Sequence, residues 1–267
     1  MTGAPSITRL RGSGRIWALG ALVGDDGALE RLAQVVLGHW QSGDELVVLG
    51  NMLGANGDPV RTLDLLLTLR RRLMAANLAC GVFFLRGAQE EMWHKLLRLQ
   101  FAMAPLDVLD WMLERGMAAT IEAYGASVAA GRAACRGRAS AIAQWTNGLR
   151  ELQALHAGHT DLLNSLQRAA LGANGAVLMT AAGIDATRPL ADQADAFWWN
   201  GQGDATLDAA LAEGADGDWR DITRLVRGAG PAIGERPDDG RVLTVTRGRP
   251  ALAVLDAAGV LLERIEA

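Results

Sequence analysis

The chain has little of several residue types that would point to a particular class of protein. Among its 267 residues are two cysteines, one tyrosine and a single lysine, Lys95. Two cysteines, Cys80 and Cys135, are too few for a disulfide framework. No apolar run reaches the roughly 18 residues that a membrane-spanning helix needs. The polar start of the chain lacks the apolar core of a signal peptide, so we expect a cytoplasmic protein without a membrane span.

The charge balance excludes a strongly basic surface. The formal net charge is −4, so no excess of positive charge indicates a nucleic-acid partner. Half of the residues are hydrophobic and 21% are charged, which is ordinary for a globular protein. The length allows one large domain or two small ones.

Strands and helices alternate in the first third of the chain. Apolar runs at 15–19, 45–50 and 78–85 predict buried strands, and the segments between the runs have helical periodicity. This alternation predicts βαβ units and a mainly parallel sheet, and hence an α/β fold. After 90 the pattern is helical to about 168, although the helices of 126–158 are not defined. The pattern predicts a further helix at 161–170, strands at 175–180 and 223–226, and an antiparallel end formed by 241–246, 251–255 and 260–265.

Glycine-containing loops follow five of these predicted strands. In α/β proteins, the carboxyl ends of strands are where binding and catalytic sites lie. In chain order the loops are Gly20-Ala-Leu-Val-Gly24, Gly50-Asn-Met-Leu-Gly-Ala-Asn-Gly57, Arg86-Gly-Ala-Gln-Glu90, Thr180-Ala-Ala-Gly183 and Gly228-Ala-Gly-Pro231.

The order and content of these loops resemble the calcineurin-like metallophosphoesterases, which include serine/threonine phosphoprotein phosphatases and dinucleoside tetraphosphatases. In that family the loops read Gly-Asp-x-His-Gly, Gly-Asp-x-x-Asp-Arg-Gly, Gly-Asn-His-Glu, Val-His-Ala-Gly and Gly-His-Thr-Pro. The resemblance covers roughly 15–263 and is most specific at 175–193. It implies a four-layer α/β/β/α sandwich over 15–267 with a helical insertion at about 98–168, preceded by a flexible N-terminal tail at 1–14.

This chain keeps the first or last glycine of each family motif, but other residues stand where the family binds metals and phosphate. Asn51 replaces the aspartate that would bridge two metal ions, Ala55 replaces the phosphate-binding arginine, and Gln89 replaces the catalytic histidine. All the vestigial site positions, in chain order, are Ala21, Val23, Asn51, Gly54, Ala55, Ala88, Gln89, Ala181 and Ala229.

These replacements remove the chemistry that a two-metal phosphoesterase needs. Such a site uses a bridging carboxylate and imidazole ligands to hold two ions and to activate water. Alanine and valine offer no ligand atom, and glutamine cannot act as a general acid or base near pH 7. We therefore expect no catalytic residue, no metal and no cofactor. The chain is predicted to be a pseudophosphatase that acts as a protein-binding or regulatory module, with a protein partner that the sequence does not identify.

One alternative is a true phosphoesterase, a protein phosphatase or nucleotide hydrolase, with a relocated metal site. The segment His156-Ala-Gly-His159-Thr160 contains the strings His-Ala-Gly and Gly-His-Thr of the family motifs. No predicted strand precedes the segment, however, so its context favours a turn between two helices, with Thr160 or Asp161 as N-cap.

A second alternative is a sensor that binds a nucleotide or another phosphorylated ligand without hydrolysis. Its candidate ligand-binding residues are Asn51, Arg86 and Glu90, with Gln89 beside them. An arginine and backbone amides at a helix N-terminus can hold an anion. The structural interpretation of the same residues is an ion pair, or an acidic residue at a helix N-terminus.

Overall fold

The computed structural model describes residues 7–76, 80–213, 219–230, 238 and 240–267. Within these residues the strands form two five-stranded sheets, in the orders β10-β9-β2-β3-β4 and β1-β5-β6-β7-β8. The strands of the first sheet are β2 (Ile16–Leu19), β3 (Glu45–Val48), β4 (Gly81–Phe84), β9 (Ala251–Leu255) and β10 (Leu261–Glu266). Those of the second are β1 (Ile7–Arg9), β5 (Ala169–Leu171), β6 (Val177–Thr180), β7 (Arg224–Ala229) and β8 (Val242–Thr246).

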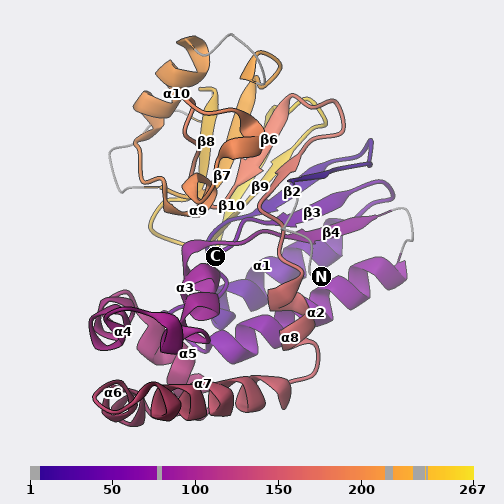
Figure 1. The fold of residues 1–267 in the computed structure, drawn as a ribbon. Coiled ribbons are helices and arrows are strands. Elements are labelled where there is room, and N and C mark those ends of the chain that lie inside the picture. The colour runs from indigo at the N-terminus through magenta and orange to yellow at the C-terminus, as the bar shows by residue number, and fades with distance from the viewer. Residues whose placement is uncertain (1–6, 77–79, 214–218, 231–237, 239) are drawn as a thin grey trace.

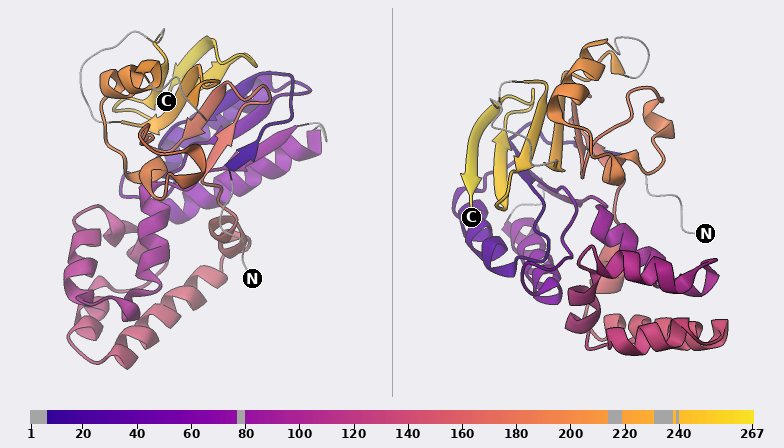
Figure 2. Two further views of the ribbon diagram at one scale, coloured as in Figure 1. Left: turned by 45° about the horizontal axis from the view of Figure 1, so that its top comes forward. Right: turned by 90° about the vertical axis from the view of Figure 1, so that its left-hand side faces the viewer.

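Helices cover the outer faces of both sheets and form a separate group at one end (Figures 1 and 2). Along the chain, α1 (Asp26–His39) connects β2 to β3, and α2 (Pro59–Ala76) connects β3 to β4. Between β4 and β5 lie α3 (Ala88–Leu96), η1 (Leu99–Phe101), α4 (Pro105–Leu113), α5 (Met117–Ala123), α6 (Val128–Cys135), α7 (Ala139–Ala154) and α8 (His159–Asn164). On the second sheet are η2 (Leu190–Asp192), α9 (Ala196–Trp199) and α10 (Asp204–Glu213).

Alternating side chains of the strands divide the interior into three apolar layers. In β2, Trp17 and Leu19 pack against the helices, whereas Ile16 and Ala18 pack against the opposite sheet. A third cluster fills the space between the second sheet and the helices α9 and α10. This period-2 pattern buries both faces of the central strands, such as β2, β3 and β6. The expected fold class, an α/β/β/α sandwich, is confirmed.

The helices on the first sheet begin and pack as their sequences predict. The carboxylate of Asp25 accepts a hydrogen bond from the amide of Ala28 at 2.8 Å and so caps α1. Pro59 begins α2, where its missing N–H costs no intrahelical bond. Leu63 and Leu66 of α2 are fully buried. These contacts hold the loops that precede both helices at one end of the sheet.

The helices α4–α7 extend away from the two sheets (Figure 1). Two contacts of Trp93 in α3 connect this group to the sandwich: its indole N–H donates to Gln153 at 2.6 Å, and its ring stacks on Tyr124 at 5.1 Å between centroids. The weakly periodic stretch 126–158 forms α6, α7 and the turn that follows α7. Among the described helices, none is long and apolar enough to cross a membrane.

Three local expectations are wrong. Residues 7–9, assigned to a flexible tail, form β1, which pairs in parallel with β5; residues 1–6 of that tail lie outside the described part of the chain. The helix predicted over 161–170 ends at Asn164, and Ala169 begins β5. The last three strands do not form one antiparallel unit, because β8 pairs in parallel with β7 while β9 and β10 pair in the other sheet. The choice of partner strand and of sheet is a tertiary property: β1 pairs with β5 and β9 pairs with β2, both distant in sequence, which local periodicity does not encode.

Candidate functional site

The five glycine loops meet at the carboxyl ends of β2, β3, β4, β6 and β7. We call residues 20–24, 50–57, 86–90, 181–183 and 228–230 the loop junction. Backbone hydrogen bonds connect them directly: Val23 N–H donates to Asn51 C=O at 2.7 Å, and Ala21 N–H donates to Gly228 C=O at 3.2 Å. Ala229 N–H donates to Ala181 C=O at 3.1 Å. Positions that are up to two hundred residues apart therefore share one site.

Two non-glycine residues of the loop junction have left-handed backbone conformations. Val23 has φ +53° and Asn51 has φ +51°. Asparagine adopts this conformation readily, but for a β-branched residue it is an outlier that the surrounding structure must hold in place. The close approach of the first two loops holds it here, because a Cβ on Gly24 would lie 2.6 Å from the carbonyl oxygen of Gly54.

The carboxylate of Glu90 connects the second and third loops. One oxygen accepts hydrogen bonds from the amides of Asn51 and Gly87, both at 2.8 Å, and the other accepts from Met52 at 2.7 Å and Leu53 at 3.0 Å. The side chain is 3% exposed and closes a capping box at the start of α3. Burial raises the pKa of Glu90, while the donated backbone hydrogen bonds act in the opposite direction.

A buried arginine that the sequence analysis did not single out supports the fourth and fifth loops. Arg227 in β7 is 1% exposed and donates to the carbonyl oxygens of Ala182 and Gln202 at 3.0 and 2.7 Å. It also bonds to Thr244 at 2.8 Å and pairs with Asp204. Burial lowers the pKa of Arg227, and Asp204 counteracts that effect. Its position inside a strand gave no pattern by which to find it.

The side chains at the vestigial positions offer few polar atoms. Ala21 and Ala181 are buried, and Ala55 is exposed. The side-chain oxygen of Asn51 accepts from the amide of Gln89 at 3.1 Å. Gln89 donates from Nε2 to the carbonyl oxygen of Arg115 at 2.8 Å, and its buried Oε1 has no hydrogen-bond partner among the described residues.

The remaining vestigial positions complete the loop surface. Gly54 is buried, whereas Val23, Ala88 and Ala229 are partly buried. Each of these four residues carries hydrogen or an aliphatic side chain, so none contributes a polar side-chain atom to the junction. Pro231 of the fifth loop lies outside the described residues.

Arg86 pairs with Glu91 and not with Glu90. The Arg86–Glu91 contact is 2.8 Å, and both side chains are 12% exposed. The Arg86 guanidinium also lies 5.9 Å from the ring centre of Trp198, a buried residue. The expected candidates Arg86, Glu90 and Asn51 are thus brought together, but each already has partners within the protein.

Aromatic and cationic side chains lie beside the third loop. Trp111 of α4 contacts Trp199 of α9, with ring centroids 5.7 Å apart. Arg115 lies 4.3 Å from the ring centre of Trp111, and Lys95 lies 6.0 Å from that of Trp199. Because Gln89 donates to the backbone of Arg115, this group continues directly from the loop junction. We call Lys95, Trp111, Arg115 and Trp199 the aromatic rim.

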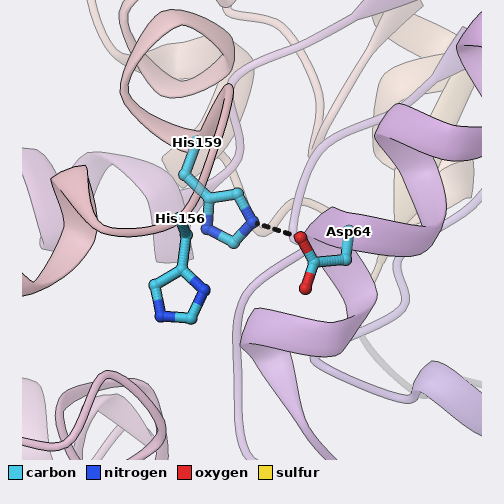
Figure 3. A group of neighbouring side chains, drawn as sticks. All are labelled: Asp64, His156 and His159. Carbon is cyan, nitrogen blue, oxygen red and sulfur yellow. Dashed lines mark hydrogen bonds and ion pairs between the residues drawn. The ribbon is translucent and has the colours of Figure 1, made fainter.

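A second group of titratable side chains lies apart from the vestigial positions. Asp64 of α2, His156 and His159 each offer a ligand atom, and these atoms lie within 4.8 Å of one another (Figure 3). The expected helix–helix turn is present between α7 and α8, but Gly158, rather than Thr160 or Asp161, is the N-cap. His159 is fully buried.

Sequence comparisons return no match: no protein-family model matches the chain, and neither does any curated protein. Solved structures with similar folds do exist. A candidate diadenosine tetraphosphatase has a TM-score of 0.53 at 14% identity, with 99% of each chain covered. A cold-active protein tyrosine phosphatase has a TM-score of 0.55 at 13% identity, covering 98% of this chain and 80% of the other.

A protein serine/threonine phosphatase from Saccharomyces cerevisiae, with similarity to human phosphatase PP5, also has a TM-score of 0.55. Its identity is 12%, and 98% of this chain and 84% of the other are covered. Identities this low establish the fold alone. The two helix-flanked sheets match the fold of these structures over nearly the whole chain, and the fold of this protein is therefore the metallophosphoesterase fold.

Proposed function

We propose that this protein is a metallophosphoesterase homologue that does not hydrolyse phosphoesters and acts as a protein-binding or regulatory module. The observation that carries the proposal is the composition of the loop junction. Five loops converge as a phosphoesterase site requires, yet the nine vestigial positions provide no carboxylate and no imidazole. A pair of divalent ions needs a bridging anion and several such ligands, so these residues do not fit a dinuclear centre.

The carboxylates that do lie near the loop junction are committed to other partners. Both oxygens of Glu90 accept backbone hydrogen bonds, and the side chain is buried. Glu91 pairs with Arg86 at 2.8 Å and lies 3.6 Å from Lys95. Releasing Glu90 to a metal would leave four backbone amides without their acceptor, a penalty of about 1–3 kcal/mol for each buried donor.

The left-handed backbone at Val23 and Asn51, which is strained at the β-branched Val23, supports descent from an active site. Left-handed conformations of non-glycine residues cost about 1–3 kcal/mol and occur where a site must aim its side chains. Here the conformations persist, while the side chains at both positions provide no metal-binding anion. The loops thus retain the geometry of a catalytic site without its ligands.

The segment between β4 and β5 carries exposed apolar side chains that could contact a partner. Large apolar side chains are exposed there at Phe101 (80%), Met103 (105%), Leu155 (79%) and Trp111 (38%). Exposed apolar and aromatic side chains concentrate in protein interfaces. Trp111 also belongs to the aromatic rim, so a partner bound at Trp111 would lie next to the former site.

The proposal is tested by assaying the purified protein with p-nitrophenyl phosphate, a phosphoserine peptide and diadenosine tetraphosphate in the presence of excess manganese. We expect no turnover above the buffer rate. The control is Asn51→Ala, which removes the side chain at the position of the bridging aspartate.

Each positive result of that assay has a distinct meaning. Turnover that Asn51→Ala abolishes would refute the proposal, because the loop junction would then be catalytic. Turnover that survives Asn51→Ala but disappears in a His156→Ala/His159→Ala variant would also refute it and would support a relocated phosphoesterase centre.

A further inference from the structure

The side chains of Asp64, His156 and His159 come together from two separate parts of the fold. Asp64 lies on α2, which packs on the first sheet, while His156 lies in the turn between α7 and α8 and His159 is the first residue of α8. His159 Nε2 is 3.1 Å from Asp64 Oδ1, and the two imidazole rings stack with centroids 5.1 Å apart (Figure 3). The cluster therefore bridges the sandwich and the helical group.

The donor set is the kind that divalent transition metals prefer. Two imidazoles and one carboxylate form the protein part of many open zinc sites, in which water completes the coordination. Zinc bonds of about 2.0–2.1 Å place tetrahedral ligand atoms about 3.3 Å apart. The separation of 3.1 Å between His159 and Asp64 is close to that value, and no pair of ligand atoms exceeds 4.8 Å.

Exposed side chains can make the small movements that would bring all three ligand atoms to metal-binding distances. Asp64 is 55% exposed and His156 is partly exposed, so either can rotate by the ångström or so that the longest separation requires. His159 is the fixed member, since it is fully buried. A site with one rigid ligand and two adjustable ones can close around an ion without moving the backbone.

A hydroxyl group orients the buried ligand. Tyr124 Oη lies 2.9 Å from His159 Nδ1, and the Tyr124 side chain is buried. Histidine ligands usually donate their second ring N–H to such a partner, which fixes the tautomer and directs the other nitrogen to the metal. Burial lowers the pKa of His159, so the ring is neutral near pH 7, and the neutral ring is the form that coordinates a metal.

We propose that Asp64, His156 and His159 bind one divalent transition-metal ion of the zinc class, with water in the open position. The ion fixes the α7–α8 turn against α2 and so sets the position of the helical group on the sandwich. This site is separate from the vestigial loops and does not depend on whether they are inactive. Without a metal, the same side chains form the Tyr124–His159–Asp64 hydrogen-bond chain, which runs from the core to the exposed Asp64 carboxylate.

The test is zinc binding by the tag-free protein, measured by elemental mass spectrometry after zinc loading and desalting, and by competition with a chelating zinc indicator. The test variant is Asp64→Ala/His156→Ala, which removes the two ligands that lie outside the core and leaves His159 with Tyr124. The control is Asp107→Ala/His39→Ala, which removes an exposed aspartate and an exposed histidine elsewhere.

We expect one zinc ion per chain in the wild type and in the control, and an affinity at least about 100-fold lower in the test variant, since two of three ligands are gone. Cobalt loading of the wild type should give the intense visible bands of a four-coordinate ion. Absence of zinc from the desalted wild type would overturn the proposal, as would equal zinc content in the test variant. Neither result would affect the assay at the loop junction, because that assay follows turnover.

Discussion

The replacement Glu90→Gln tests whether one carboxylate holds the loop junction together. Each Glu90 oxygen accepts two backbone hydrogen bonds, from Asn51 and Gly87 on one side and from Met52 and Leu53 on the other. Glutamine has nearly the same shape, but its amide nitrogen donates and cannot accept. Two buried N–H groups would therefore face another donor and lose their acceptor.

The expected magnitude follows from that count. Each buried donor without a partner costs about 1–3 kcal/mol, which gives about 2–6 kcal/mol for two. Removal of a buried charge, whose desolvation raises the pKa of Glu90, offsets part of this loss. We expect the free energy of unfolding to fall by about 3 kcal/mol.

The assay is equilibrium urea denaturation at pH 7, followed by tryptophan fluorescence and far-UV circular dichroism. The matched control is Glu30→Gln, the same chemical change at a side chain that is 54% exposed and pairs with Arg61. The control should change stability by less than about 1 kcal/mol, as expected for an exposed ion pair. A loss below about 1 kcal/mol in Glu90→Gln would refute the reasoning.

Three further predictions concern the same structure. Gly87→Ala should lower the free energy of unfolding, measured by urea denaturation, by about 1–3 kcal/mol, because the new Cβ would lie 2.3 Å from a backbone nitrogen of the second loop. The control is Gly148→Ala on α7, where a Cβ would meet no other atom within 4 Å, and it should be neutral or stabilising. Tyr124→Phe should weaken zinc binding about 10-fold, measured by indicator competition, because His159 loses its orienting partner; an unchanged affinity would contradict this role. The free energy of unfolding, measured by urea denaturation between pH 5 and 8, should fall as the pH drops below about 6.5. The pKa of His159 is lowered in the folded state, so the unfolded chain binds more protons in that window and is favoured there. A free energy of unfolding that rises on acidification would contradict this prediction.

The strand–loop–helix order of the first half was readable from the sequence because its signals are local. Asp25 caps α1 by accepting a hydrogen bond from Ala28, three residues later, and Pro59 begins α2. The alternation in β2 places Trp17 and Ala18 on opposite faces, as period-2 packing requires. The fold class follows from such signals together with the five glycine loops.

The elements that sequence reasoning missed depend on which strand and which sheet each one joins. Strand β1 has three residues and is defined by its pairing with β5, about 160 residues later. Strands β8 and β9 are neighbours in sequence, but β8 pairs with β7 in one sheet and β9 pairs with β2 in the other. Short strands carry too little periodicity to indicate which sheet they join.

The candidate site, too, was predictable from the sequence only in part. The loops and the replaced residues were visible in the sequence, because each loop keeps at least one glycine of its motif. The roles of Glu90 as an acceptor for the second loop and of Arg227 as a support for the fourth depend on tertiary contacts. The approach of Asp64 to His159 joins residues 95 positions apart, so the histidine pair alone gave no indication of its carboxylate.

The most direct test of the central claim is the manganese content of the Asp64→Ala/His156→Ala variant after loading with excess manganese and desalting. This variant lacks the proposed zinc ligands, so any retained ion must be held elsewhere. We predict that a folded variant retains no manganese, because the loop junction has no carboxylate or imidazole to spare. About two ions per chain would contradict the account and return the loop junction to the class of active metallophosphoesterase sites.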